Sequence, residues 1–190
     1  DTTVKKIDSN GSGVWTFTGH SDRVQAVAVD GNANVYSASD DITVRKLDST
    51  GSQVWSFTGH SNSVQAVAVD GNANVYSGGS DDTIKKLDST GSLVWTFVGH
   101  SNTVEALAVD SNSNVYSASA DTTVKKIDST GSEVWSFTGH SNDVEAVTVD
   151  GNGNVYSGGS DDTVRKIDSN GTEVWSFTGH TNIVNAIAFG

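Results

Sequence analysis

A forty-residue unit recurs along the chain, and this repeat constrains the fold more than any other feature of the sequence. A Gly-His pair occurs five times at intervals of forty residues, and a Trp recurs at the same interval. Residues 19–58 and 59–98 differ at only eleven of forty positions. Copies this similar indicate recent amplification or design. The repeated Trp residues are Trp15, Trp55, Trp95, Trp135 and Trp175.

Within one unit the residue pattern has a period of two, which indicates strands rather than helices. Residues 24–29 form an apolar run suited to a strand buried on both faces. Residues 34–39, 43–48 and 54–57 contain the residue types that favour further strands. The intervening segment 30–34 reads Asp-Gly-Asn-Ala-Asn, and we expect its Gly and Asn residues to supply the positive φ of a tight turn.

Four short antiparallel strands in forty residues are typical of a β-propeller blade. Such a blade is too thin to bury its own faces, so blades must stack on one another. The sequence therefore predicts an all-β propeller of four-stranded blades, with the Trp side chains packed between blades. We expect one propeller segment over 1–190, made of a half blade with the last two strands (1–18), complete repeats at 19–58, 59–98, 99–138 and 139–178, and the first strand of a further blade (179–190).

The two blade fragments at the ends do not add up to one blade. Residues 2–17 supply a third and a fourth strand, and residues 184–189 supply a first strand. We therefore expect a ring that one chain of this sequence does not close. Unpaired strand edges and exposed apolar faces favour association. Either further residues belong to the chain or another copy completes the ring, and a homodimer is the partner prediction.

Several motifs of the unit resemble the WD-repeat family over essentially the whole chain. They are Gly19-His20 before the first strand, Ser37-Ala38-Ser39 on the second, and the run from Asp41 to Asp48 through the third. The unit departs from the family at Leu47, which stands where the family has the Trp of its Trp-Asp pair. The resemblance implies a propeller that acts as a scaffold for protein–protein interaction.

A second resemblance is to the repeat of quinoprotein propellers. It is carried by the segment from Val75 to Asp81 and by the segment from Leu87 to Trp95, since that family uses an Asp-x-x-Thr-Gly turn and a following Trp to lock adjacent blades. A quinoprotein enzyme would need cofactor residues in single copy, and the sequence shows none, so we expect no enzyme and no cofactor. A repeat with a purely structural role and no ligand is a further alternative, because a specific site requires blades to differ.

Each complete unit contains a Ser, a His and an Asp, the residue types of a hydrolase triad, in which His deprotonates Ser and is oriented by a carboxylate. A nucleophile also needs an oxyanion hole and a pocket made once. Four identical copies argue instead for a structural brace, and the WD resemblance implies that His links to Ser and Asp. We predict no catalytic residue and a brace formed by His20, Ser37, Asp41, His60, Ser77, Asp81, His100, Ser117, Asp121, His140, Ser157 and Asp161.

The sequence offers weak candidates for a metal site. Segment 30–34 has oxygen ligands at alternate positions, like the start of a calcium loop. However, Val35 stands where an EF-hand requires Gly, and no helices flank the segment. In pairs such as Asp81-Asp82, one Asp already belongs to the predicted brace. The chain has no Cys to supply thiolate ligands. We therefore expect hairpin turns and no metal.

The copies differ most informatively just after the Gly-His pair and at the second residue of the first strand. In the WD-repeat family these positions lie around the central channel, where partners dock. Neutral drift at exposed positions is the alternative explanation. The candidate binding face consists of Arg23, Gln25, Ser63, Gln65, Thr103, Glu105, Asp143 and Glu145, with other proteins or peptides as further partners.

The formal net charge of −12 disfavours two classes of partner, because an acidic surface repels phosphate groups. We expect no binding to nucleic acid or to a membrane. No apolar run approaches the roughly 18 residues of a membrane helix, and nothing resembles a signal peptide. The expectation is a soluble protein, for which the sequence assigns no compartment and the cytoplasm is favoured.

Overall fold

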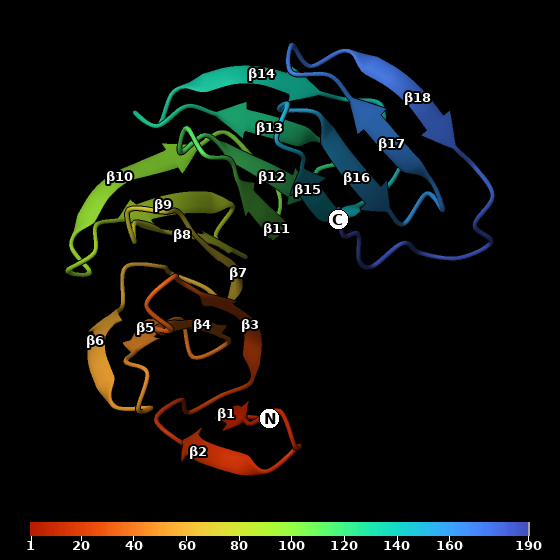
Figure 1. Ribbon diagram of the computed structural model, residues 1–190. Coiled ribbons are helices and arrows are strands. Elements are labelled where there is room, and N and C mark those ends of the chain that lie inside the picture. The colour runs from red at the N-terminus through yellow and green to blue at the C-terminus, as the bar shows by residue number, and fades with distance from the viewer. Residues whose placement is uncertain (190) are drawn as a thin grey trace.

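The computed structural model describes residues 1–189, and this range contains eighteen strands and no helix. The strands form four four-stranded sheets and one two-stranded sheet, with antiparallel pairing throughout. The sheets follow one another along an open arc (Figure 1). The prediction of an all-β propeller of four-stranded blades, not closed by one chain, is confirmed.

Each strand is four to six residues long. Chain order and sheet order coincide within every blade, since consecutive strands pair. The strands are β1 (Val4–Ile7) and β2 (Gly13–Phe17) in the half blade; β3 (Val24–Val29), β4 (Val35–Ser39), β5 (Val44–Leu47) and β6 (Gln53–Phe57) in the first blade; β7 (Val64–Val69), β8 (Val75–Gly79), β9 (Thr83–Leu87) and β10 (Leu93–Val98) in the second; β11 (Val104–Val109), β12 (Val115–Ser119), β13 (Val124–Ile127) and β14 (Glu133–Phe137) in the third; and β15 (Val144–Val149), β16 (Val155–Gly159), β17 (Val164–Ile167) and β18 (Glu173–Phe177) in the fourth.

The first strand of each blade lies on the inside of the arc, and the fourth strand lies on the outside. Figure 1 shows β3, β7, β11 and β15 along the inner edge and β6, β10, β14 and β18 along the outer edge. Neighbouring inner strands also contact one another from blade to blade. The second residues of the inner strands therefore surround the centre of the arc.

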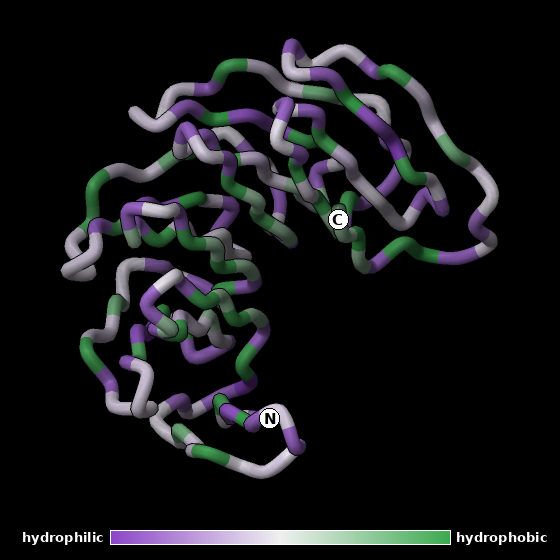
Figure 2. The backbone as a smooth tube through the Cα atoms, viewed as in Figure 1, coloured by the Kyte–Doolittle hydropathy of each residue, from purple (hydrophilic) through white to green (hydrophobic). Residues whose placement is uncertain are grey.

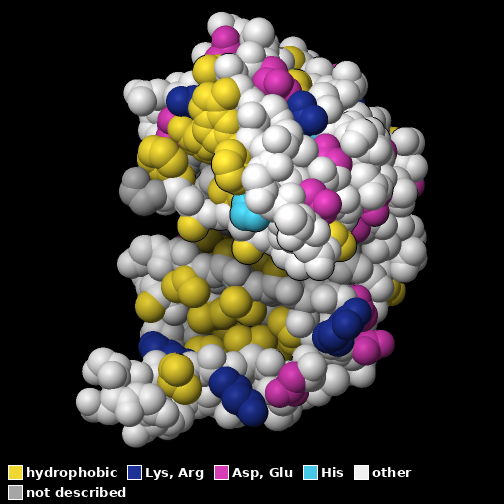
Figure 3. Space-filling model, turned by 90° about the vertical axis from the view of Figure 1, so that its right-hand side faces the viewer, with side chains coloured by type: hydrophobic (Ala, Val, Ile, Leu, Met, Phe, Trp, Pro, Cys, Tyr) yellow, Lys and Arg dark blue, Asp and Glu magenta, His cyan; other side chains and the backbone are white. Residues whose placement is uncertain are grey.

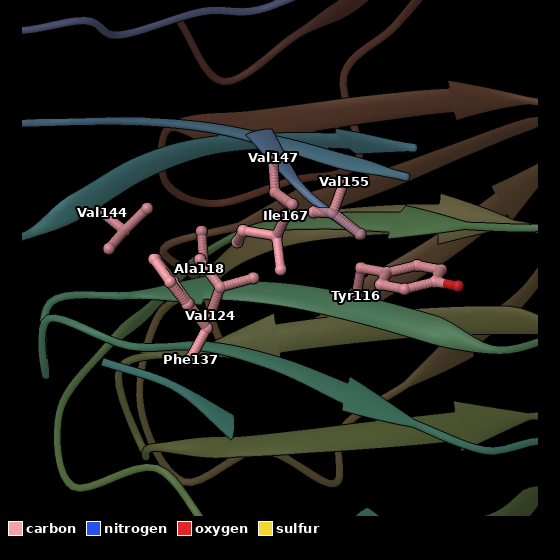
Figure 4. Packing of buried hydrophobic residues seen from close by; sticks show 8 residues of the cluster. All are labelled: Tyr116, Ala118, Val124, Phe137, Val144, Val147, Val155 and Ile167. Carbon is pink, nitrogen blue, oxygen red and sulfur yellow. The ribbon is translucent and has the colours of Figure 1, made fainter. Parts of the chain in front are cut away.

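The hydrophobic core lies between blades rather than inside them. Apolar residues recur along every strand (Figure 2), and a thin sheet can bury them only against the next sheet. Equivalent clusters occur between the first and second blades and between the second and third. Figure 4 shows the cluster between the third and fourth blades, formed by Tyr116, Ala118, Val124, Phe137, Val144, Val147, Val155 and Ile167.

The turn after the inner strand differs from the sequence expectation. The positive φ falls on Ala33 (φ 60) and not on Gly31 or Asn32. The reason is the carboxylate of Asp30, whose Oδ1 accepts the backbone N–H groups of Asn32 and Asn34, both at 2.9 Å. These two bonds fold the turn tightly around Asp30 and leave the residue before Asn34 in the left-handed region. The segment is a hairpin turn, as expected.

Residues 184–189 form no strand, in contrast to the sequence expectation. They run in extended form along the fourth blade, where the Val184 N–H donates to the Gly159 carbonyl at 3.1 Å. The Phe189 ring stacks on Tyr156 with 5.4 Å between ring centroids. A strand requires a ladder with a neighbouring strand, and no strand within residues 1–189 pairs with this segment.

Candidate functional site

Each complete blade brings its Ser, His and Asp side chains together beneath the loop that precedes the inner strand. In the first blade, His20 Nδ1 lies 2.8 Å from Asp41 Oδ2 and His20 Nε2 lies 2.7 Å from Ser37 Oγ. Thr43, which the sequence analysis did not single out, donates its hydroxyl to Asp41 Oδ1 at 2.6 Å. The other blades repeat the His–Ser and His–Asp bonds with His60, Ser77 and Asp81, with His100, Ser117 and Asp121, and with His140, Ser157 and Asp161.

The electrostatics of the brace assign its protons. Burial lowers the pKa of His20 below its ordinary value, and Asp41 offsets only part of this effect. Burial alone would raise the pKa of Asp41, but hydrogen bonds from Thr43 and His20 bring that pKa down to about 2. The ionised carboxylate can only accept, so the neutral imidazole donates its Nδ1–H to Asp41. Its Nε2 therefore accepts a hydrogen bond from the hydroxyl of Ser37.

The Ser hydroxyls of the brace lie out of reach of a substrate. Ser37, Ser77, Ser117 and Ser157 are each 0% exposed. The Asp41 carboxylate also accepts the backbone N–H of Ser21 at 3.1 Å, which ties the loop before the inner strand to the turn after the second strand. Chemically, the arrangement can hold two loops together.

A second repeated contact joins consecutive blades. The indole N–H of Trp15 donates to the Ser49 carbonyl in the next blade at 3.2 Å. The ring rests on Gly51, where an added Cβ would lie 2.6 Å from a ring carbon of Trp15. Gly51 also has a φ of +87°, so both the close Trp15 ring and the backbone conformation favour Gly at this position. The Trp15 ring thus lies between the half blade and the first blade.

A Lys residue strengthens the same contact, and the sequence analysis did not find it. Lys46 Nζ lies 3.4 Å from the Ser89 carbonyl of the next blade, which also accepts the indole N–H of Trp55 at 3.3 Å. Lys46 Nζ lies above the Tyr36 ring, 5.4 Å from its centroid. The recurrence of a Lys at this position in every unit is the signal that could have found it.

The candidate binding face surrounds a cavity at the centre of the arc. Register shifts within each inner strand leave the second residue outside the ladder, as at Gln25 between Val24 and Ala26. A bulge of this kind re-aims a side chain. The four bulge residues, together with Asn185, line a cavity of about 320 Å³: they are Gln25, Gln65, Glu105 and Glu145.

The contacts of these bulge residues differ from blade to blade. Gln25 Nε2 donates to Asp40 Oδ1 at 2.8 Å, and Arg23 Nε donates to Asp40 Oδ2 at 3.1 Å. In the fourth blade, Ser160 Oγ donates instead to Glu145 Oε1 at 2.6 Å. The positions that contact the bulge residues, such as Asp40 and Ser160, were not part of the sequence-based binding face. Of the remaining predicted positions, Arg23 is exposed, and the others are half-buried: Ser63, Thr103 and Asp143.

The face is electrostatically asymmetric. Burial raises the pKa of Glu105, and the negative charges of Glu145 and Asp143 raise it further. Acidic groups thus gather on the third and fourth blades, whereas in the first blade Arg23 and Gln25 both bind the Asp40 carboxylate. A partner that touches all blades would meet a graded surface rather than a repeated one.

A second cavity, of about 390 Å³, lies between the turns of the third and fourth blades. It includes Gly153, at a position where the third blade has Ser113. Both of its carboxylates already accept hydrogen bonds, Asp110 from Asn114 and Tyr116, and Asp150 from Asn154. In the part of the chain that the structure describes, no group of three or more His, Cys, Asp or Glu side chains is arranged to hold a metal ion. The same residues contain no helix with the length and apolar character needed to cross a membrane.

Comparison with known families gives two matches. The model of the family described as outer membrane protein assembly factor BamB matches residues 80–188. The model of the IP5P C-F β-propeller matches residues 1–127. The search of curated proteins found no match. Both family matches are to propeller repeats, which agrees with the blades of the structure, and neither is a WD-repeat match.

Proposed function

The chain belongs to the β-propeller repeat proteins described by the BamB and IP5P C-F families, and from this premise we propose that it is a non-catalytic scaffold. It binds proteins or peptides on the face around its central cavity and completes its ring by self-association. Its repeat is WD-like in its Gly-His element and in its Ser-His-Asp brace. The acidic net charge of −12 supports protein partners over nucleic acid.

One observation carries the binding proposal: blades with the same brace differ on the channel face. The brace residues are the same in all four complete blades, whereas the position before the inner strand changes from Arg23 to Ser63, Thr103 and Asp143. A repeat kept only for architecture has no need of this variation in side-chain type. The difference therefore supports one oriented partner rather than an empty channel.

Two observations favour a scaffold over an enzyme. The candidate nucleophiles are fully buried in the brace, which supports a structural role for them. The name of the matched BamB family describes an assembly factor. A quinoprotein-type enzyme is the second candidate, and it predicts an absorbance band from a bound quinone in the purified chain. A spectrum that shows such a band would overturn the non-catalytic proposal.

A peptide library displayed on phage tests the binding face. Peptides selected on the full chain should lose at least about tenfold in affinity, roughly 1.4 kcal/mol, in the double variant Arg23→Ala/Asp143→Ala. The matched control is Ser56→Ala on the outer strand β6, which should bind as the parent does. Selected peptides that bind the double variant and the parent equally would favour the alternative of a structural repeat without a ligand.

The open ends of the arc support self-association. Trp175 and Phe177 at one end are 42% and 52% exposed, and Ile7 at the other end is 66% exposed. Figure 3, which views the open side of the arc, shows hydrophobic side chains gathered along the hollow. Apolar faces of this kind are energetically costly in water and favour burial against a partner.

A further inference from the structure

The N-terminal end of the arc presents one half of the contact that joins consecutive blades. The turn of its half blade has the internal geometry, since Asp8 Oδ1 accepts the N–H groups of Asn10 and Ser12, both at 2.8 Å. Gly11 has a φ of +80°, like its equivalents in the complete blades. Nothing lies within 4 Å of a Cβ built on Gly11, whereas Gly51, Gly91, Gly131 and Gly171 each carry a Trp of the preceding blade.

The C-terminal end presents the other half. Trp175 is 42% exposed, while the four equivalent Trp residues are half-buried. Those four donate their indole N–H groups to the carbonyls of Ser49, Ser89, Ser129 and Ser169. By the forty-residue repeat, the acceptor equivalent to these carbonyls is that of Ser9. Within residues 1–189 the indole of Trp175 makes no such bond.

The His and the Asp of the brace are divided between the ends in the same way, while its Ser belongs to the second strand of a blade, which neither end supplies. His180 is exposed and keeps only its edge-on contact with Phe177, at 5.5 Å between ring centroids. Asp1 and Thr3 hold the positions that Asp41 and Thr43 hold in the first blade. Thr3 Oγ1 is the one buried side-chain polar atom without a hydrogen-bond partner among the described residues. A His in the internal position would lie beside it, as His20 Nδ1 lies 3.3 Å from Thr43 Oγ1.

The apolar surface at the N-terminal end fits the same arrangement. Val27 is 56% exposed, whereas its equivalents Val67 and Val147 are 8% exposed. Internal inner strands contact their neighbours, as β11 contacts β15. In the internal joints this Val packs against the second and third strands of the preceding blade, as Val67 does against Ala38 and Val44, so residues 184–189 of a second copy would cover Val27 in part. A groove of about 290 Å³ there is lined by apolar residues that include Val4, Trp15 and Val27.

We propose that a second copy of this chain docks head to tail. Trp175 of one copy rests on the Gly11 turn of the other and donates to its Ser9 carbonyl. His180 of the first copy faces Asp1 and Thr3 of the second. A second copy is the occupant because the two ends complement each other in the register of the internal joints, apart from the second strand of the shared blade, which neither copy supplies. Two such joints close a ring of two chains. The inference rests on the proposed self-association and names its contacts.

Engineered disulfides test the joint, because the chain has no Cys. A Cβ on Gly171 lies 3.2 Å from the Trp135 Cβ, a few tenths of an ångström short of the ~3.5–4.5 Å of a disulfide, and Gly11 and Gly171 share a positive φ, so Cys is strained equally in the test pair and in the control pair. The pair Gly11→Cys/Trp175→Cys has the same geometry across the proposed joint. After oxidation it should migrate on a non-reducing gel at twice the 19.8 kDa of the chain. The matched control, Trp135→Cys/Gly171→Cys, should stay at the mass of one chain with no free thiol.

The outcomes separate the joint from the proposed function. If the Gly11→Cys/Trp175→Cys variant is a dimer by light scattering under reducing conditions but forms no covalent dimer after oxidation, the joint is refuted and self-association stands. A disulfide within one chain would show that the chain closes on itself, which refutes both. A ladder of larger species would support the joint and refute a ring of two chains.

A second measurement uses no disulfide. The variant Trp175→Ala should raise the dissociation constant of the dimer by about tenfold or more, because a Trp that enters a pocket dominates an interface. The control Val174→Ala should leave the constant unchanged. Val174 is 54% exposed, like Val134, its counterpart in the third blade, at 53%, so it lies outside the joint. Equal dissociation constants for the two variants would overturn the proposal.

Discussion

The brace makes a quantitative prediction at Ser77, whose hydroxyl is removed by the variant Ser77→Ala. Ser77 is 0% exposed and its Oγ lies 2.8 Å from His60 Nε2. His60 Nδ1 stays bound to Asp81 at 3.0 Å, so the ring cannot turn to find another donor without losing that bond. The variant therefore leaves Nε2 as a buried acceptor without a partner.

The expected cost follows from this unsatisfied nitrogen. A buried polar atom that loses its hydrogen bond costs about 1–3 kcal/mol. Burial lowers the pKa of His60, so the ring does not escape the cost by taking up a proton at neutral pH. For a chain of this size, each kcal/mol shifts the Tm by about 2–4 °C. We expect Ser77→Ala to lower the free energy of unfolding by about 2 kcal/mol and the Tm by about 4–8 °C.

The assay is urea and thermal unfolding, followed by Trp fluorescence at equal protein concentrations. The matched control is Ser56→Ala, the same chemical change on the exposed outer strand β6, which should stay within about 0.5 kcal/mol of the parent. A loss below about 0.5 kcal/mol for Ser77→Ala, or equal losses in both variants, would refute the structural brace.

Three further predictions follow from the geometry. Because burial lowers the pKa of His20, His60 and His140, the unfolded chain binds more protons below pH ~6.5. The Tm should therefore fall as the pH drops through that value. It should fall further below pH ~4, because the pKa of Asp41 is about 2 in the folded chain and the unfolded chain takes up that proton first. Calorimetry from pH 8 to pH 3 checks this, and a Tm unchanged between pH 7 and pH 5 contradicts it. Ile42 has a φ of 63°, a conformation that strains a β-branched residue, so Ile42→Asn should raise the free energy of unfolding by about 1 kcal/mol in urea melts, and a loss would contradict the strain. Lys86→Met should retain the packing of the stem but lose the bond to the Ser129 carbonyl (3.2 Å), and urea melts should show a free energy of unfolding lower by about 0.5–1.5 kcal/mol. Lys5→Met on the half blade's exposed side is the control and should change nothing, so equal losses in the two variants would contradict the role of Lys86.

The blade could be predicted from the sequence because its pattern is local. The apolar run at 24–29 and the alternation that follows it define strands within one unit, and the repeat then fixes how units stack. The contacts of Trp15 and its equivalents between blades also follow from their fixed position in the unit. Residues 184–189 could not be predicted in this way, because strand formation depends on a partner strand elsewhere.

Side-chain competition explains the other misses. The residue pattern at 30–34 suggests Gly31 for the positive φ, but the carboxylate of Asp30 selects Ala33 by taking two backbone N–H groups. The recurrence of Lys46 in every unit marks its position, but its role depends on a backbone carbonyl in another blade, which the sequence of one unit does not reveal. The sequence predicted the binding face from the differences between copies. The bulge that aims Gln25 into the central cavity becomes visible only in the pairing of strands β3 and β4.

The central claim is that two copies share one ring, and the mass of the chain in solution tests it most directly. Light scattering behind a sizing column gives this mass without assumptions about shape. The account predicts a single species at twice 19.8 kDa, with function to be sought on the joint channel face. A species at 19.8 kDa over the whole concentration range would contradict it.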